Sequence, residues 1–148
     1  MFPNAKGSEL LSVLATIDPA SLSAGTVSTG WIAANNHHTL MALIQTGALG
    51  TSATLDAKLQ QASDASGSGA KDISGKAITQ IVKASGDNKQ ALINVRPEEL
   101  DVNAGFAYVR LSITVGTAAS IASAVVLGVN PRYASADAQN QTAVAQIV

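Results

Sequence analysis

The chain has 148 residues and a mass of 14.9 kDa, which is the size of one ordinary domain and leaves no room for a second. Hydrophobic residues make up 47% and charged residues 13%, a balance that predicts a folded chain and excludes a disordered linker. Nine Lys and Arg against ten Asp and Glu give a net charge of -1, which argues against nucleic-acid binding. Cysteine is absent, which excludes disulfides, thiol catalysis and Cys-ligated metals.

In the first part of the chain the sequence gives little signal for helices and only weak signals for most strands. Residues 8–15 are a marginal helix candidate with Ser8 as its cap. Residues 10–17 and 26–33 are weak strand candidates. The stretch 39–45, TLMALIQ, is nearly all apolar, which is typical of a central strand covered on both faces.

The clearest strands alternate apolar and polar residues. Residues 54–60 and 106–115 both follow this period-2 pattern, so one face of each should be buried. Residues 120–129 form a second continuous apolar run, again typical of a strand covered on both faces. The remaining candidates are strands at 77–82 and 90–95 and a single helical turn at 97–100.

These elements predict an all-β protein. About eight short strands, spaced by roughly ten residues with turn signals between them, favour an antiparallel β-sandwich or jelly roll. The uncharged stretch 111–131 is long enough to cross a bilayer, but Gly116-Thr117 interrupts it, so we expect two strands and no membrane span. We divide the chain into an N-terminal arm at 1–8, the sandwich at 9–133 and a C-terminal arm at 134–148.

The two arms are candidates for contacts with other molecules. Phe2 gives the N-terminal arm an apolar tip. The last seven residues, TAVAQIV, predict a strand that either returns to its own sheet or extends the sheet of a neighbour.

No pattern in the sequence indicates catalysis. His37 and His38 are adjacent, so on a strand they point to opposite faces and cannot chelate one metal together. The nucleophile motif Gly-x-Ser-x-Gly does not occur. The acidic residues Glu98, Glu99 and Asp101 do not follow a calcium-loop pattern and are expected in a solvated turn. We therefore expect no enzyme activity, no cofactor, no metal and no small-molecule substrate.

Interaction with other protein subunits is the function that composition favours. Aromatic residues are only 3% of the chain, fewer than a ligand pocket usually needs, and a nearly neutral surface with few charges tends to associate. We expect a homo-oligomer, with a dimer as the default. Trp31 is expected in the core. The candidate interface residues are Phe2, Arg110, Arg132, Tyr133, Val144, Ile147 and Val148.

Three segments carry a resemblance to a known family. They are LDAKLQQASDASGSGAKDISGKAITQI, FAYVRLSITVG and AVVLGVNPRYA, within residues 55–134. In these segments the chain resembles the capsid cement (decoration) proteins of tailed bacteriophages, a jelly-roll family known from a Bordetella podovirus. The resemblance implies a virion protein, assembled in the host cytoplasm, that binds the outside of an HK97-fold capsid. Its partner would be the phage major capsid protein, whose neighbouring subunits it would bridge.

Two other functions fit the same pattern. A carbohydrate-binding or adhesin-like β-sandwich shares the jelly-roll pattern, and Trp31, Tyr108 and Tyr133 are its sizeable aromatic candidates. A structural component of the head–tail junction or tail is the other alternative.

Overall fold

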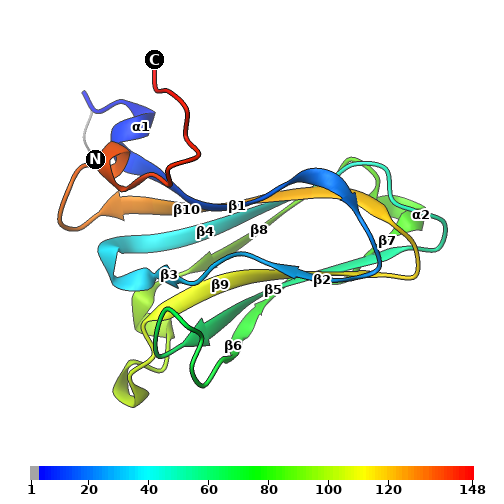
Figure 1. Ribbon diagram of the computed structural model, residues 1–148, viewed down its shortest axis with the longest axis horizontal. Helices are drawn as coiled ribbons and strands as arrows, with labels where there is room; N and C mark the ends of the chain where they lie inside the picture. The colour runs from blue at the N-terminus through cyan, green and yellow to red at the C-terminus, as the bar shows by residue number, and fades with distance from the viewer. Residues whose placement is uncertain (1–3) are drawn as a thin grey trace.

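The computed structural model describes residues 4–148, so the predicted interface residue Phe2 lies outside the described residues. Two antiparallel β-sheets lie face to face (Figure 1). The first sheet has four strands, in the order β1 (Leu11–Leu22), β10 (Ser120–Pro131), β4 (His37–Thr46) and β8 (Gln90–Val95).

The second sheet is built on two long central strands, β9 (Tyr108–Gly116) and β5 (Thr54–Ala62). Two short strands, β2 (Gly25–Ser28) and β3 (Ile32–Ala33), pair with the outer edge of β9 one after the other. On the other side, β6 (Lys71–Ala77) and β7 (Ile81–Val82) pair with β5 in the same way. Among the described residues, ten strands therefore occupy eight positions, four in each sheet.

This arrangement is a jelly roll. The chain passes from one sheet to the other between most strand positions, the exception being β5 and β6, which pair within the second sheet, and the last strand, β10, lies between β1 and β4 in the first sheet. The predicted fold class is confirmed. The other described elements are short: α1 (Gly7–Leu10), α2 (Lys83–Gly86) and the 3-10 turns η1 (Ala34–Asn36), η2 (Pro97–Glu99), η3 (Val102–Ala104) and η4 (Ala136–Gln139).

The core lies between the sheets and follows the predicted alternation. Leu55, Ala57 and Leu59 on β5 point inward, as do the apolar residues at alternate positions of β9. Leu111 pairs with Leu59 across these strands, and both side chains are fully enclosed. The sequence between β9 and β10 makes the predicted turn, with Thr117 at φ 70°. Among residues 4–148 no helix is long and apolar enough to cross a membrane.

Several local predictions were wrong. The helix at 8–15 is a single turn at Gly7–Leu10 capped by Lys6, because β1 begins at Leu11 and its residues pair with β10. The strand predicted at 77–82 is misplaced: β7 covers only Ile81–Val82, and β6 ends at Ala77 after beginning at Lys71, in a polar segment without the apolar periodicity that marks a strand. Trp31 is half-buried and lies outside the core cluster, between β2 and β3.

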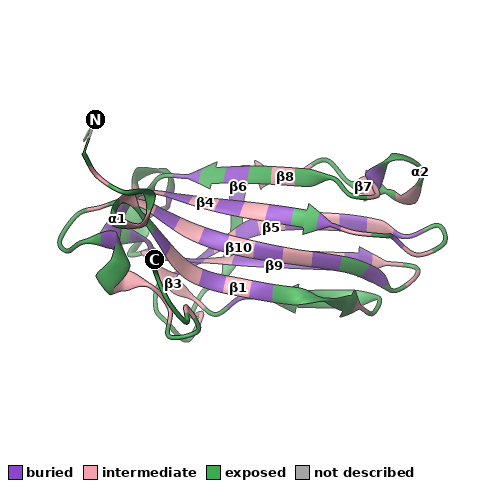
Figure 2. Cartoon of the chain, turned by 90° about the horizontal axis from the view of Figure 1, so that it is seen from above, coloured by how far each residue is buried: buried purple, intermediate pink, exposed green. Residues whose placement is uncertain are grey.

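The two apolar runs also differ from expectation. Strands β4 and β10 are central, but their burial alternates along the strand, because the second sheet covers only the inner face of the first sheet (Figure 2). The prediction that both faces of these strands are covered is therefore wrong for the single chain.

Candidate interaction surface

The outer surface of the first sheet is apolar. We call it the apolar face. Cross-strand register places Val125 of β10 beside Leu43 of β4, which in turn lies beside Leu92 of β8. The next row contains Val13 of β1, Leu127 of β10 and Met41 of β4. The apolar face comprises Leu11, Val13, Met41, Leu43, Leu92, Ile121, Val125, Leu127 and Val129.

No Asp, Glu, Lys or Arg lies in β10, β4 or β8, three of the four strands of the apolar face. Apart from the two histidines at the start of β4, these three strands consist of apolar residues, glycine and the neutral polar residues Ser, Thr, Asn and Gln. Leu92 is 56% exposed and Ile121 is 48% exposed, which is high for large aliphatic side chains on sheet strands. Covering this surface would remove apolar area from water without desolvating a charge.

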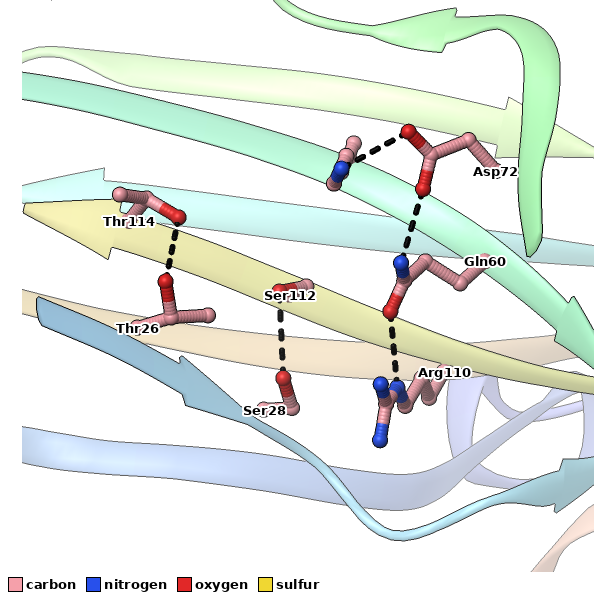
Figure 3. Close-up of polar contacts among 8 residues, drawn as sticks. Thr26, Ser28, Gln60, Asp72, Arg110, Ser112 and Thr114 are labelled. Atoms are coloured by element: carbon pink, nitrogen blue, oxygen red, sulfur yellow. Dashed lines mark hydrogen bonds and ion pairs between the residues drawn. The ribbon is translucent and has the colours of Figure 1, made fainter. Parts of the chain in front are cut away.

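The outer surface of the second sheet is chemically opposite. Hydroxyl pairs link its strands: Thr26 and Thr114 lie 2.8 Å apart, and Ser28 donates to Ser112 at 3.1 Å (Figure 3). These hydroxyl groups satisfy one another in pairs along the strands; the Thr26–Thr114 pair is exposed, whereas Ser112 is buried. This surface needs no partner to cover it.

On the same polar surface, Gln60 bridges two charged side chains, those of Arg110 and Asp72. Arg110 Nε donates to Gln60 Oε1 at 2.9 Å, and Gln60 Nε2 donates to Asp72 Oδ1 at 2.8 Å (Figure 3). Lys58 Nζ lies 2.7 Å from Asp72 Oδ2, and its hydrogen bond lowers the pKa of the Asp72 carboxyl below its ordinary value. The Lys58 and Asp72 side chains are both exposed, so this network lies on a solvated face.

Both arginines predicted to serve an interface are bonded within the chain. The Arg110 guanidinium lies 4.5 Å from the centre of the Trp31 ring, in cation–π geometry. Arg132 contacts Glu98 Oε1 at 3.0 Å and donates from Nε to the carbonyl of His37 at 3.1 Å. Both guanidinium groups therefore have partners within the chain, and a role toward another molecule stays a prediction.

The acidic residues at 98–101 are each paired with a different cation. Glu98 pairs with Arg132, Glu99 with Lys76 at 2.9 Å, and Asp101 with Lys71. The pKa of Glu99 is lowered first by the backbone N–H of Arg96 and then by Lys76. The sequence could not show these pairs, because each cation lies more than twenty residues away. Among residues 4–148 no group of three or more acidic or histidine side chains is arranged to hold a metal ion.

The C-terminal segment is not a strand. No residue of 142–148 joins a sheet, so the predicted terminal strand is wrong. The segment is anchored further back: Asn140 Oδ1 accepts from the backbone N–H of Val13 at 2.7 Å, and Gln141 N–H donates to the Val13 carbonyl at 2.8 Å. These bonds occupy both backbone groups of Val13 on the side of β1 that faces away from β10. At this position the edge of β1 is therefore not free to pair with another strand.

The predicted C-terminal interface residues lie beside the apolar face. Val144 is half-buried, and with Ile147 it lines a groove of about 280 Å³ whose other walls include Leu11, Val13 and Leu127. Val148 is fully exposed. Tyr133, 79% exposed, follows the end of β10. The structure therefore brings Val144 and Ile147 to the margin of the apolar face, separate from Arg110 on the opposite sheet.

A buried histidine links β4, β1 and the C-terminal segment. Ser12 Oγ donates to the Ala136 carbonyl at 2.7 Å, so it accepts the N–H of His37 Nε2 at 3.1 Å. His37 Nδ1 is buried and has no hydrogen-bond partner among the described residues. Burial lowers the pKa of His37. A Cβ on Gly128 would lie 2.5 Å from this ring, so only glycine leaves room for it. His38 is exposed, as the predicted alternation requires.

Comparisons with known proteins concern the fold. No family model and no curated protein sequence matches the chain. Among solved structures, the chain is similar to a protein of the naturally occurring empty particles of Cowpea mosaic virus, with 12% identity, 86% of each chain covered and a TM-score of 0.45. The prophage-derived protein YomS of SPBc2 has 10% identity over 80% of this chain and 93% of that one, with a TM-score of 0.43.

A third similar structure belongs to a different functional class. It is the C-terminal family 22 carbohydrate-binding module of Clostridium thermocellum Xyn10B, with 14% identity over 87% of this chain and 90% of that one and a TM-score of 0.40. At such identities function has to be argued from this chain's own residues.

The apolar face was missed at the level of sequence, although a signal for it was present. Residues 39–45 and 120–129 read as strands with two apolar faces, and that reading of the residues is correct. Only the assumption that the same chain covers both faces was wrong. Leu92 gave no signal, because one exposed leucine in a short strand is common.

Proposed function

We propose that this protein is a structural component of a bacteriophage virion that binds the outside of the capsid through its apolar face and acts without catalysis. Its partner is the major capsid protein, and it bridges neighbouring subunits of the shell. The sequence resemblance over residues 55–134 supports the choice of partner. The observation that carries the proposal is the apolar face itself.

An apolar outward face is unfavourable in water. Central strands β4 and β10 have apolar side chains on both sides, but the chain supplies a second layer on one side only. A contiguous exposed apolar surface of this kind marks an interaction site in soluble proteins. The second sheet, whose outer surface is a satisfied polar network, shows that the fold does not itself require apolar outward positions.

The size of the apolar face indicates how binding would be achieved. Strands lie about 4.8 Å apart and rise about 3.4 Å per residue, so a face of four strands, each about eight residues long, has an area of roughly 500 Å². A standard stable interface buries about 800 Å² per partner, so one contact is weak alone. On a closed lattice many such contacts act together through high effective concentration, and the shell is held tightly. Because no charges are involved, binding should depend little on salt.

The direct test places a charge in the middle of the apolar face. Leu43→Lys should abolish decoration of capsid particles, because the lysine would have to be desolvated at the centre of the contact. Thr114→Lys, on the polar surface of the second sheet, is the matched control and should bind normally. Bound protein is measured by co-sedimentation of purified variants with particles that lack the protein.

Copy number separates the capsid from other virion sites. Purified virions should contain this protein in numbers comparable to the major capsid protein. A few copies per particle would instead place it at the head–tail junction or tail. Normal decoration by Leu43→Lys, or loss of decoration by Thr114→Lys alone, would contradict the apolar face as the binding surface.

Removal of the C-terminal residues tests the predicted arm. Deletion of 142–148 should leave a folded protein, because none of these residues pairs in a sheet, whereas Asn140 and Gln141 keep their bonds to Val13. We expect the truncated protein to detach from particles, since Val144 and Ile147 extend the apolar face at its margin. Circular dichroism and co-sedimentation measure the two effects. Full decoration by the folded truncated protein would show that the segment is not a clamp.

A further inference from the structure

The free edges of the two sheets differ in how they are protected against pairing with another chain. The edge of β1 contains Asp18 and Pro19, has two register irregularities and is capped at Val13 by the C-terminal segment. The edge formed by β2 and β3 is interrupted at Gly30 and Trp31. These are the devices by which sheet proteins avoid edge-to-edge association.

The edge formed by β6 and β7 is protected as well. Strand β6 contains Lys71, Asp72 and Lys76, has an irregular register with β5 and includes Gly75 at φ 74°. Strand β7 has only two residues.

Strand β8 has none of these protections. Its six residues, QALINV, include no charge, proline or glycine, and its register with β4 is continuous from Gln90 to Val95. It lies along one border of the first sheet, opposite β1 (Figure 2). Within residues 4–148 its only sheet partner is β4, so the backbone groups on its other side face outward. Leu92, the most exposed side chain of the apolar face within a strand, lies at its middle.

We propose that β8 pairs antiparallel with β8 of a second copy of this chain, with Leu92 opposite the partner's Leu92. Inward residues must oppose inward residues, and this register satisfies that condition. Gln90 then faces the partner's Asn94, so the two amides can hydrogen-bond across the strands. The exposed Leu92 side chain of each copy is then covered by Leu92 of the other copy.

The charges next to β8 do not oppose pairing with a second copy. Lys89 precedes the strand and Arg96 follows it. In the proposed register Lys89 opposes the partner's Val95 and Arg96 opposes the partner's Asn88, so no like charges meet. A two-fold axis perpendicular to the sheet relates the two strands, which creates a continuous eight-stranded sheet with both apolar faces on the same side. The inference stands independently of what the apolar face binds.

Cysteine cross-linking of the full chain tests both the edge and the register, because the protein has no cysteine of its own. Directly opposed residues in an antiparallel pair have Cα atoms about 4.5–5.5 Å apart, which is within disulfide range. Leu92→Cys should therefore form a covalent dimer on mild oxidation. Asn94→Cys should not, because its two copies would be offset by four residues, about 14 Å along the strands. Ile121→Cys, of similar exposure on a central strand, measures random cross-linking.

Sedimentation of the uncross-linked protein completes the test. The unmodified chain should have twice the mass of 14.9 kDa, and Leu92→Lys should have the mass of one chain because two lysines would face each other. Leu43→Lys should remain dimeric even if it no longer binds particles, which separates this inference from the proposed function. A monomeric wild-type chain, a dimer that Leu92→Cys does not cross-link above the Ile121→Cys level, or equal cross-linking by Asn94→Cys would overturn the proposal.

Discussion

Replacement of Leu111 by alanine is expected to lower the free energy of unfolding by about 3 kcal/mol, within the range for a leucine removed from a packed core. Leu111 is fully enclosed on the central strand β9, where it pairs with the equally buried Leu59 of β5. Both strands have neighbours on each side, so the surrounding backbone can relax little into the space left behind. Denaturant-induced unfolding, followed by circular dichroism, measures the change.

Leu92→Ala is the control for this prediction. The side chain is the same, but 56% of Leu92 is exposed on β8, so its truncation should change the unfolding free energy of the monomer by no more than about 0.5 kcal/mol. The comparison is made at a protein concentration low enough to exclude association. Equal losses for the two variants would show that Leu111 does not lie in the principal core.

Acidification is expected to destabilise the protein through His37. Burial lowers the pKa of His37 in the folded state, so the unfolded chain binds a proton at a higher pH than the folded chain does. The contribution of this group to stability is therefore complete above its ordinary pKa of 6.5 and falls as the pH decreases below that value. Once protonated, Nδ1 would carry a hydrogen that no neighbouring group in the described chain accepts. Unfolding free energy measured between about pH 8 and pH 5 should decrease toward acid.

Two variants isolate the histidine responsible. His37→Gln cannot be protonated and should lose this pH dependence, whereas His38→Gln should retain it because His38 is exposed. A second decrease at lower pH is expected in all three proteins, since ion pairs and hydrogen bonds lower the pKa of Asp72 and Glu99. An unchanged slope in His37→Gln would refute the assignment. The C-terminal segment should loosen with His37, because Ser12 connects the ring to Ala136.

The success of the sequence-based predictions depended on how local each signal was. Strands β5 and β9 were placed within two residues of their bounds, because alternation along one strand reflects burial of one face and needs no knowledge of the neighbours. The weaker candidate at 90–95 also matches β8, which turn signals bound on both sides. The terminal heptapeptide 142–148 has strand-like residues but forms no strand, because a strand also needs a free edge at which to pair. The β1 edge beside it is capped by Asn140 and Gln141.

Composition and periodicity by themselves determined the all-β class, the number of strand positions and the alternating core of β5 and β9, because these follow from residue type and spacing along one segment. Tertiary structure alone decided which outward faces remain uncovered and which edges remain free. Two apolar faces on β4 and β10 look identical in sequence whether the second layer comes from the same chain or from another molecule. Only the jelly-roll strand order leaves that layer missing and puts the uncharged β8 at a border of the sheet.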